Sequence, residues 1–547
     1  MSDQTGIHNS GWQALKPLMF AVFLATGIAM GIHINKEGKD KFSQIFEIIS
    51  KDYVDSTKTE QLQEDAIEHM LSQLDPHSSY IPPQLSEINE RQIRGSYEGL
   101  GIEYIKYRDT LFVFNVLKGG SAEKAGLLSG DRLVMANGVN LTDSLSAIQV
   151  QEAIQGEKGS SARLLVYRRS SNKFMNMTIP RANIVINSSE VYYMVNKTLG
   201  YIQIERFSGS TYKQFLEALN ILKKNGLKDL ILDLRNNGGG LLNEAVAIAN
   251  EFLEKDQVIS YTYGLHRMRN DYIADGNGTF KDGKLILLIN HNTASASEIL
   301  AGALQDNDRA VVMGNRSFGK GLVQEPFRLS DGSTLRLTIA RYYTPSGRSI
   351  QKTYTKNIEL YRNEIYRRNL EKDTLDPILD STIKKEFFSK NGRLLTAGGG
   401  IRPDVFLRDT ISDSTEIETL MPGLFYSHIF DIYLLDFMYG DIDDISQHYK
   451  DINSFDRNYQ IESKHITKFI SVAKRIPYLR NLKFSAKTSH VIQKYLKAAI
   501  GFRIFGEIGK SQIINLEEDV FSKSFDVLKN YERILNIGRQ KSRNFDY

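Results

Sequence analysis

The sequence predicts a multidomain protein with a layered α/β core, a smaller β-rich domain and a helical C-terminal region. A chain of 547 residues exceeds the roughly 250–300 residues at which single cores stop growing, so several domains are expected. The nearly all-apolar segments 229–234 and 284–289 are typical of buried parallel strands. Segments with helical spacing alternate with strands from about 182 to 410, which predicts helices packed on the faces of a sheet.

The composition excludes several classes of function. The net charge of +4 is small for this length, and no sustained basic stripe is present, so we expect no nucleic-acid partner. The absence of cysteine excludes disulfides, thiolate metal sites and cysteine nucleophiles, and it fits an oxidising envelope compartment. Because no His-Glu-x-x-His or comparable cluster occurs, we expect neither a metal nor another cofactor.

The N-terminus carries an uncharged apolar run from Leu18 to Ile34, between Lys16 and Lys36. This length is at the short limit for a membrane span and slightly long for a signal-peptide core. No clear cleavage site follows Met30. We therefore expect residues 1–35 to form a short cytoplasmic tail and a signal anchor, with a cleaved signal peptide or a buried helix as alternatives. No other segment reaches spanning length.

The next two regions differ in their expected secondary structure. Residues 36–94 form an N-terminal helical segment, since apolar residues in 40–73 recur at helical spacing before a turn-rich break at 75–83. Residues 95–181 form a separate domain of short strands and glycine turns. Its expected elements are strands at 111–116, 130–138 and 163–168, a short helix at 121–127 capped by Ser121, and an amphipathic segment at 146–154.

This order of elements resembles a PDZ domain. The loop formed by Gly99, Leu100, Gly101 and Ile102 matches the carboxylate-binding loop, and 121–138 matches the run that follows it, with Ala122 in place of the usual proline. Glycines let backbone N–H groups turn toward a carboxylate, and the neighbouring strand edge can add a peptide as a further strand. The alternative is that these are ordinary turn glycines.

Residues 182–410 form the predicted α/β core. Strands are expected at 200–204, 229–234 and 284–289, and helices at 211–225, 241–253 and 295–305. Residues 411–547 are rich in aromatic residues and lysine and are expected to be mostly helical, with no chemical motif.

Ser295 is the first candidate for chemistry. It follows a buried strand and a short turn, where a helix begins, and a helix start exposes unpaired N–H groups that can hold an oxyanion. The small neighbours Ala294 and Ala296 would let a substrate backbone approach. Helix capping is the alternative, because serine and threonine are favoured there and Thr293, Ser295 and Ser297 compete for that position.

A second glycine-rich strand end, at 233–241, is expected at the same edge of the sheet. Its backbone amides could supply the other half of an oxyanion hole. A phosphate-binding Walker A loop would need a lysine and a hydroxyl residue after the last glycine, but Leu241 and Leu242 stand there.

Lys320 lies between Gly319 and Gly321. Burial between these glycines would disfavour its ammonium form and lower its pKa toward the range of a general base, whereas a surface turn lysine is the alternative. Gln324, four residues on, could bind and orient it. A histidine base would have to be His291, which comes directly out of a buried strand as a turn residue.

Together these segments resemble the carboxyl-terminal processing, or tail-specific, proteases, a family of serine–lysine (S41-type) endopeptidases. The resemblance spans roughly 40–405. Besides the PDZ run, it includes the segments 74–81, 232–242, 292–310, 317–324, 341–351 and 398–405.

The resemblance implies a crotonase-like, ClpP-like layered protease core with Ser295 as nucleophile, Lys320 as base and Gln324 assisting. The spacing of 25 residues from Ser295 to Lys320 agrees with the family, and the spacing of 23 from Ser297 does not. Ala296 with Gly239 or Gly240 would form the oxyanion hole. Asp306 matches a position expected to give structural support. Gly238 replaces a proline of many members.

The implied function is a serine endopeptidase that trims or degrades envelope proteins from their C-termini, with the PDZ domain binding the substrate's C-terminus. The implied location is the periplasm, with the N-terminal helix anchored in the inner membrane. A homodimer and an adaptor lipoprotein are possible partners. The alternatives are an inactive PDZ scaffold and a Ser–His hydrolase that uses His291.

Overall fold

The computed structural model describes residues 40–142, 145–157, 159–354, 359–361, 386–407, 415–480, 484–518 and 520–536, and the single residues 21 and 364. The predicted anchor at 18–34 lies outside these ranges except for Ala21, so it stays a prediction. Every helix within the described ranges is too short or too polar to cross a bilayer.

The chain divides into two compact units, Met1–Asp75 and Pro76–Tyr547. In the first, the helix expected over 40–73 is two helices, α2 (Lys41–Asp52) and α3 (Thr59–Ser72). Asp40 caps α2 by accepting a hydrogen bond from Ser43 N–H at 2.8 Å. The expectation of continuous helix was wrong at 53–58, where Tyr53 is extended and a Val-Asp-Ser-Thr run of weak helix formers follows.

The β-rich domain has an antiparallel sheet in the order β3 (Ile102–Tyr107), β4 (Thr110–Val116), β5 (Arg132–Ala136), β7 (Ser161–Arg168) and β8 (Lys173–Pro180), with β6 (Val139–Asn140) beside β5. Helix α6 (Ala147–Ile154) begins with a capping box formed by Ser146 and Gln149. The expected cap at Ser121 was wrong, because Gly120 occupies the N-cap position of α5 (Ser121–Lys124) and no side chain caps it.

Two short strands mark where this domain joins the rest of the chain. β2 (Ser96–Gly99) pairs antiparallel with β9 (Ala182–Val185), which brings the start and the end of the domain together. The domain is therefore an insertion carried on a two-stranded stem.

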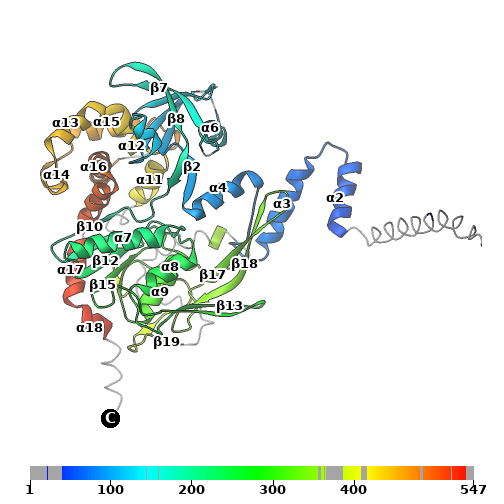
Figure 1. Cartoon of the computed structure of the whole chain (residues 1–547), viewed down its shortest axis with the longest axis vertical. Coiled ribbons are helices and arrows are strands. Elements are labelled where there is room, and N and C mark those ends of the chain that lie inside the picture. The colour runs from blue at the N-terminus through cyan, green and yellow to red at the C-terminus, as the bar shows by residue number, and fades with distance from the viewer. Residues whose placement is uncertain are drawn as a thin grey trace, which may run out of the picture. The chain divides into compact units, whose positions relative to one another are not determined.

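The core sheet has the order β10 (Tyr192–Met194), β11 (Leu199–Gln203), β12 (Asp229–Asp233), β15 (Leu285–Ile289), β16 (Val311–Gly314) and β21 (Val405–Phe406), and it is parallel from β11 onward. Alternate residues of β15 face opposite sides. Leu285, Leu287 and Ile289 pack with α7 (Thr211–Lys224), α8 (Leu242–Asn250) and α9 (Ala296–Asp306). Ile286 and Leu288 pack with α17 (Val520–Lys529) and α18 (Tyr531–Leu535). Figure 1 shows α17 and α18 running along the core sheet. The predicted layered α/β core is confirmed.

A second sheet is antiparallel and joins β1 (Ser79–Ile81), β18 (Thr334–Tyr343), β13 (Val258–Gly264) and β14 (Arg267–Ile273), with β17 (Leu322–Arg328) on β18. Strand β1 lies inside the segment expected to be only a turn-rich break. Ser79 pairs with Arg336, so a distant strand determines its structure rather than local sequence.

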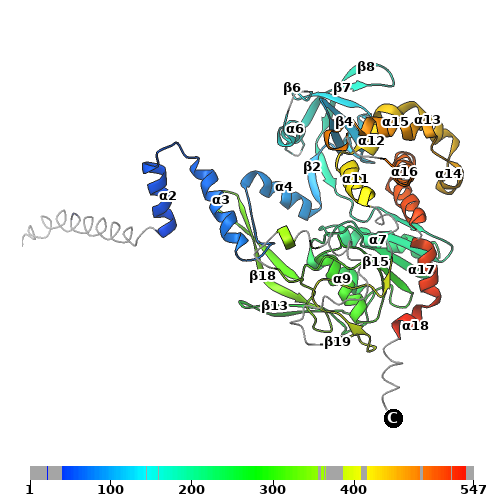
Figure 2. The ribbon, with the colours of Figure 1, turned by 180° about the vertical axis from the view of Figure 1, so that it is seen from behind.

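The C-terminal region is helical in its described residues. It comprises α11 (Thr415–Tyr426), α12 (Ile429–Phe437), α13 (Tyr439–His448), α14 (Ile452–Asn458), α15 (Ser463–Ala473), the short 3₁₀ turn η1 (Pro477–Leu479) and α16 (Ala486–Glu517), which share one apolar core before α17 and α18. Ile105 of β3 belongs to that core, so these helices pack on the β-rich domain. Figure 2 shows α16, α17 and α18 following one another from beside β4 along the core sheet.

Candidate active site

Ser295 stands at the N-cap of α9 in a conformation that non-glycine residues rarely adopt. Its φ is 58° and its ψ is −118°, the geometry of the first central residue of a type II′ turn, where glycine is normal. Backbone strain of this kind is typical of functional sites, and a sharp strand-to-helix turn presents a nucleophilic serine in α/β hydrolases. Ser295 is partly exposed at this turn.

The two competing hydroxyl residues are fully buried. Thr293 Oγ1 donates a hydrogen bond to Leu234 O at 2.8 Å and accepts one from Asn290 N–H at 2.9 Å. Ser297 Oγ donates to Asn237 O at 3.0 Å. Both hydroxyls therefore join the start of α9 to the loop after β12, which leaves Ser295 as the hydroxyl open to a substrate.

The glycine-rich loop after β12 lies directly against Ser295. A Cβ placed on Gly239 would be 2.8 Å from Ser295 Cβ and 3.0 Å from Ala296 N. The Gly239 N–H already donates to Asn237 Oδ1 at 2.8 Å. For the N–H groups of Gly240 and Ala296, the described residues provide no hydrogen-bond acceptor. The structure thus places Gly239 beside Ser295 and Ala296. The N–H group of Gly239 is engaged by Asn237, whereas that of Gly240 is not.

Lys320 lies in the loop between β16 and β17. Its Nζ donates a hydrogen bond to Gln324 Oε1 at 2.7 Å, and Gln324 Nε2 donates in turn to His77 O. The side chain is partly buried, between the expected burial and the surface position that was the alternative. The flanking glycines serve backbone packing instead: a Cβ on Gly319 would be 2.9 Å from Gly399 C, and one on Gly321 would be 2.8 Å from Gln351 N.

Glu298 connects the serine-bearing and lysine-bearing loops, and the sequence reasoning missed it. Its fully buried carboxylate accepts hydrogen bonds from the backbone N–H groups of Ser295 at 2.9 Å and Lys320 at 2.8 Å. It also accepts from Gly319 N–H at 2.7 Å and Ser317 Oγ at 2.5 Å. Burial raises the pKa of Glu298, and these hydrogen bonds oppose that rise. The available signal was the capping-box spacing, with Glu298 three residues after the N-cap serine.

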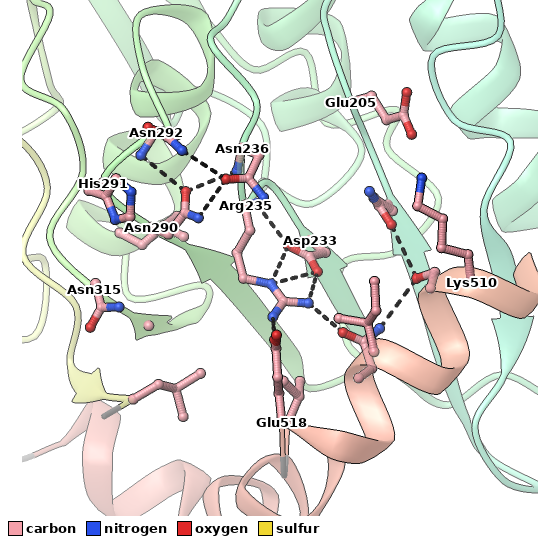
Figure 3. Close-up of a pocket in the computed structure, with 18 of the residues that line it drawn as sticks. Glu205, Asp233, Arg235, Asn236, Asn290, His291, Asn292, Asn315, Lys510 and Glu518 are labelled. Atoms are coloured by element: carbon pink, nitrogen blue, oxygen red, sulfur yellow. Dashed lines mark hydrogen bonds and ion pairs between the residues drawn. The ribbon is translucent and has the colours of Figure 1, made fainter. Parts of the chain in front are cut away.

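His291 lies in the turn after β15 and lines a different cavity, of about 600 Å³, shown in Figure 3. The acidic partner that a His-based triad would use is Asp233. Its carboxylate accepts hydrogen bonds from Arg235 Nη2 at 2.5 Å and Tyr201 OH at 2.6 Å. The geometry therefore gives Asp233 a structural role beside Arg235.

Asp306, at the end of α9, is buried with Arg348. Arg348 Nη2 donates to Asp306 Oδ1 at 2.7 Å, and the side chains are each 1% exposed. Ser346 Oγ donates to the second carboxylate oxygen at 2.6 Å. Asp306 thus holds the 344–348 turn against α9, which matches the expected structural support.

The β-rich domain has a cavity of about 310 Å³ at its predicted peptide-binding loop. Gly99, Leu100 and Ile102 line it, together with Gln151 and Ile154 of α6. In the described part of the chain β3 pairs with β4 alone, so its other edge is unpaired, and Ile102 and Tyr104 of β3 line this cavity. Gly101 has a φ of 78°, and its carbonyl accepts a hydrogen bond from Leu117 N–H at 2.9 Å.

The ranges that the structure covers contain no group of three or more His, Asp or Glu side chains arranged to hold a metal ion.

Models of four families match parts of the chain. They are peptidase family S41 over residues 198–360, the PDZ domain over 112–168, the N-terminal domain of the activating protease CtpB over 29–84, and a family of unknown function over 421–506. The first two matches fall on the α/β core and on the β-rich domain.

Several proteins that are similar to this chain are described as proteases. A carboxy-terminal-processing protease of Bartonella bacilliformis is 36% identical over 318 residues, covering 57% of this chain and 72% of that protein. A probable CtpA-like serine protease of Staphylococcus aureus is 31% identical over 358 residues, covering 63% and 71%. Among solved structures, the photosystem II D1 C-terminal processing protease is 28% identical and covers 69% of this chain and 89% of its own, with a TM-score of 0.36.

Proposed function

Because the chain belongs to the carboxy-terminal-processing proteases of peptidase family S41, which are serine-type peptidases, we propose that Ser295 is its nucleophile and Lys320 its general base. The observation that carries this proposal is the shared anchor at Glu298. One buried carboxylate binds the N–H groups of both Ser295 and Lys320, so the two loops are fixed in position relative to each other. A nucleophile and its base need such fixed relative placement.

In the proposed mechanism, neutral Lys320 takes the proton from Ser295 Oγ as the serine attacks the scissile carbonyl. Gln324 holds the lysine amine, and the His77 carbonyl holds Gln324. Lys320 then gives the proton to the leaving amine, which leaves an acyl ester on Ser295. Water activated by Lys320 hydrolyses that ester and regenerates the enzyme.

The oxyanion of each tetrahedral intermediate would be held by backbone amides. Ala296 N–H lies at the first position of α9, where helix N–H groups have no intrahelical acceptor. We assign the second donor to Gly240, because the Gly239 N–H is engaged by Asn237. Two such donors in a fixed orientation stabilise the charge as it develops.

The proposed substrates are proteins with an accessible C-terminus. The open edge of β3 and the cavity at Gly99–Ile102 suit a peptide that adds as a strand and places its terminal carboxylate at the glycine loop. We further propose that residues 18–34 anchor the enzyme in the inner membrane, with the protease in the periplasm. A homodimer and an adaptor lipoprotein are proposed partners.

A test of the assignment uses the full chain and a peptide substrate with a free C-terminus. Ser295→Ala and Lys320→Ala are each expected to reduce kcat by at least about 10³-fold, while His291→Ala keeps the rate. Loss of turnover in His291→Ala with retention in Lys320→Ala would instead establish a histidine base. Recovering proteins bound to Ser295→Ala, and comparing their C-termini with those in wild-type cells, then identifies substrates.

An inactive PDZ scaffold is the remaining alternative. It predicts that the wild-type chain binds tails without cleaving them, so that Ser295→Ala changes no product. Peptidase activity that disappears with Ser295→Ala rejects it.

A further inference from the structure

The cavity of about 310 Å³ at the loop Gly99–Ile102 is built by more than the PDZ domain. Arg91 reaches it from α4 (Pro83–Arg94), which precedes that domain, and Arg206 reaches it from the segment after β11 of the core. Ile186, which follows β9, lines the same cavity. A tail bound here therefore contacts side chains from three parts of the chain.

One part of the cavity lining is apolar. Leu100 and Ile102 of the loop and Ile154 of α6 are buried side chains that line it. An apolar side chain at the end of a tail would remove its surface from water against these residues. In the proposed function the backbone N–H groups of the loop bind the terminal carboxylate, so this part of the cavity accounts for the last residue of a tail.

The rest of the lining is cationic. Among the described residues that line the cavity, Arg91 and Arg206 carry a charge and none is an aspartate or a glutamate. Burial raises the pKa of both tyrosines of the lining, so they add no negative charge at neutral pH. A concave site with charges of one sign favours a ligand of the other sign. The uncharged polar residues of the lining are Tyr97, Tyr104, Gln151 and Gln155.

The guanidinium of Arg91 is held in place from two sides. Its Nη1 donates a hydrogen bond to Gln155 Oε1 at 2.6 Å, and its Nη2 donates to Glu87 Oε1 at 2.5 Å. Gln155 Oε1 also accepts from Gln151 Nε2 at 3.1 Å, which ties Arg91 to the helix that lines the cavity. A guanidinium has five N–H donors, so these two bonds leave donors for a ligand. The Glu87 side chain is 70% exposed, and solvent therefore weakens its neutralisation of Arg91.

Arg206 combines a fixed backbone with an exposed side chain. Its carbonyl accepts a hydrogen bond from Thr211 Oγ1 at 3.1 Å, and the next residue, Phe207, donates its N–H to Gly239 O at 3.0 Å. The preceding residue, Glu205, lines the other cavity, shown in Figure 3, together with Lys510. The carboxylate next to Arg206 in sequence thus belongs to a different site.

The two arginines come from segments that pack against each other. Gly209 N–H donates a hydrogen bond to Ile93 O at 3.3 Å, and a Cβ built on Gly209 would be 3.1 Å from Arg94 O. The end of α4 and the segment after β11 therefore keep one relative position. This packing makes Arg91 and Arg206 a preformed pair of cations at one cavity.

We propose that Arg91 and Arg206 are specificity-determining residues that select tails with an acidic side chain close to an apolar C-terminal residue. The proposal rests on the tail-binding function proposed above for this cavity. The apolar lining takes the terminal side chain, and the two guanidinium groups bind the carboxylate of an aspartate or glutamate that precedes it. Hydrogen bonds between guanidinium and carboxylate groups are strong and geometrically selective.

The first experiment measures the affinity of peptide tails for the full chain with Ser295→Ala, so that no tail is cleaved. The peptides end in the same apolar residue and carry either aspartate or asparagine at each preceding position in turn. At one position or more, aspartate is expected to bind at least about tenfold more tightly than asparagine, and high salt should reduce this preference. Equal affinities for aspartate and asparagine at every position overturn the proposal.

The second experiment repeats these measurements with arginine variants. Arg91→Gln and Arg206→Gln are each expected to lower the preference for aspartate at least about threefold, and the double variant to abolish it. Arg94→Gln on the same helix, where the side chain is 70% exposed, and Lys213→Gln on α7 remove a charge away from the cavity and should keep the preference. A preference for aspartate that survives in the double variant overturns the proposal.

A charge reversal separates recognition from a structural role. Arg206→Glu should make a tail with lysine at the selected position bind more tightly than one with asparagine, which loss of folding would not produce. Because Arg206 is exposed, its variants decide the question even if Arg91→Gln is unstable. Arg206→Glu with an unchanged preference for aspartate contradicts the role of this residue.

Tails with a free or an amidated C-terminus distinguish failure of this proposal from failure of the proposed function. If free tails bind more tightly than amidated ones but aspartate has no effect, the cavity binds tails and the proposed selection is overturned. If the arginine variants then weaken only the free tails, the arginines bind the terminal carboxylate instead. If no tail of either kind binds, the tail-binding function of the cavity is rejected together with the selection.

Discussion

Oε2 of Glu298 accepts a hydrogen bond from the backbone N–H of Lys320 at 2.8 Å, which ties the first turn of α9 to the lysine-bearing loop. The same oxygen accepts from Ser295 N–H, and Oε1 accepts from Gly319 N–H and Ser317 Oγ. Four donors thus converge on one fully buried carboxylate. The arrangement explains how two loops 25 residues apart in sequence keep one geometry, and it gives Glu298 a role that is testable without touching Ser295 or Lys320.

Replacing Glu298 with glutamine should damage both activity and stability. The amide offers one acceptor oxygen, so its NH₂ group must face either the Ser295 and Lys320 N–H groups or those around Ser317. We expect kcat to fall by about 10²-fold and the free energy of unfolding to fall by about 1–3 kcal/mol. Kinetics and chemical denaturation measure the two effects. Glu325→Gln on the exposed part of β17 is the control, and a Glu298→Gln enzyme with wild-type kcat would contradict the anchor.

Gly238 and Gly239, which are consecutive, should respond very differently when each is changed to alanine. At Gly239 an added Cβ would lie 2.8 Å from Ser295 Cβ, and φ is 97°, whereas at Gly238 it would meet nothing. We expect Gly239→Ala to lower kcat by at least about 10²-fold through displacement of the nucleophile, and Gly238→Ala to stay within about twofold of wild type. Comparable rates for the two variants would show that the loop does not pack on Ser295 as described.

Part of this site could be predicted from sequence because neighbouring parallel strands end at one edge of a sheet. Strands β12 and β15 are adjacent, so the glycine loop and Ser295 had to lie close together. The loop that carries Lys320 follows β16, which pairs with β15. Its link to the Ser295 turn is the carboxylate of Glu298. Because Glu298 lies three residues after Ser295, the sequence there fits an ordinary helix cap equally well.

The features that escaped prediction depend on partners far along the chain. Strand β1 exists because Ser79 pairs with Arg336, and no local pattern marks it. Likewise, Asn515 lies in α16 and Glu518 directly after it, in a region with no chemical motif. Both accept hydrogen bonds from Arg235, which is 280 and 283 residues away. Local propensity carries no information about such pairs.

The helical domain should lose stability as pH rises through neutrality because of His428. The nearby carboxylate of Asp431 raises the pKa of His428 above its usual 6.5, with His428 Nδ1 and Asp431 Oδ2 3.8 Å apart. Since the folded state binds the proton more tightly, this contribution is fully present below pH 6.5 and is lost as pH rises through the raised pKa. The side chain is 59% exposed, so the effect is small and salt-sensitive.

The variant that tests this is His428→Asn, because His428 has a φ of 52° and asparagine tolerates left-handed backbone. We expect the difference in Tm between pH 5.5 and pH 8.5 to become smaller in His428→Asn and in Asp431→Asn alike. If both variants keep the wild-type pH dependence, the pair does not contribute to it.

The tail-binding role of the PDZ domain makes a prediction about the substrate's terminal group. If the carboxylate is held at the loop Gly99–Ile102, a peptide whose C-terminus is amidated lacks the charge that these N–H groups bind. We expect KM for the amidated peptide to rise at least about tenfold, because roughly one charge-assisted hydrogen bond is lost, while kcat changes less. A short ester without a tail provides the reference, since its rate should be the same in wild type and in Gly101→Ala, where the φ of 78° disfavours a side chain. Equal KM values for peptides with a free and with an amidated C-terminus would show that the groove does not recognise a terminal carboxylate. Cleavage would then depend on internal sequence alone.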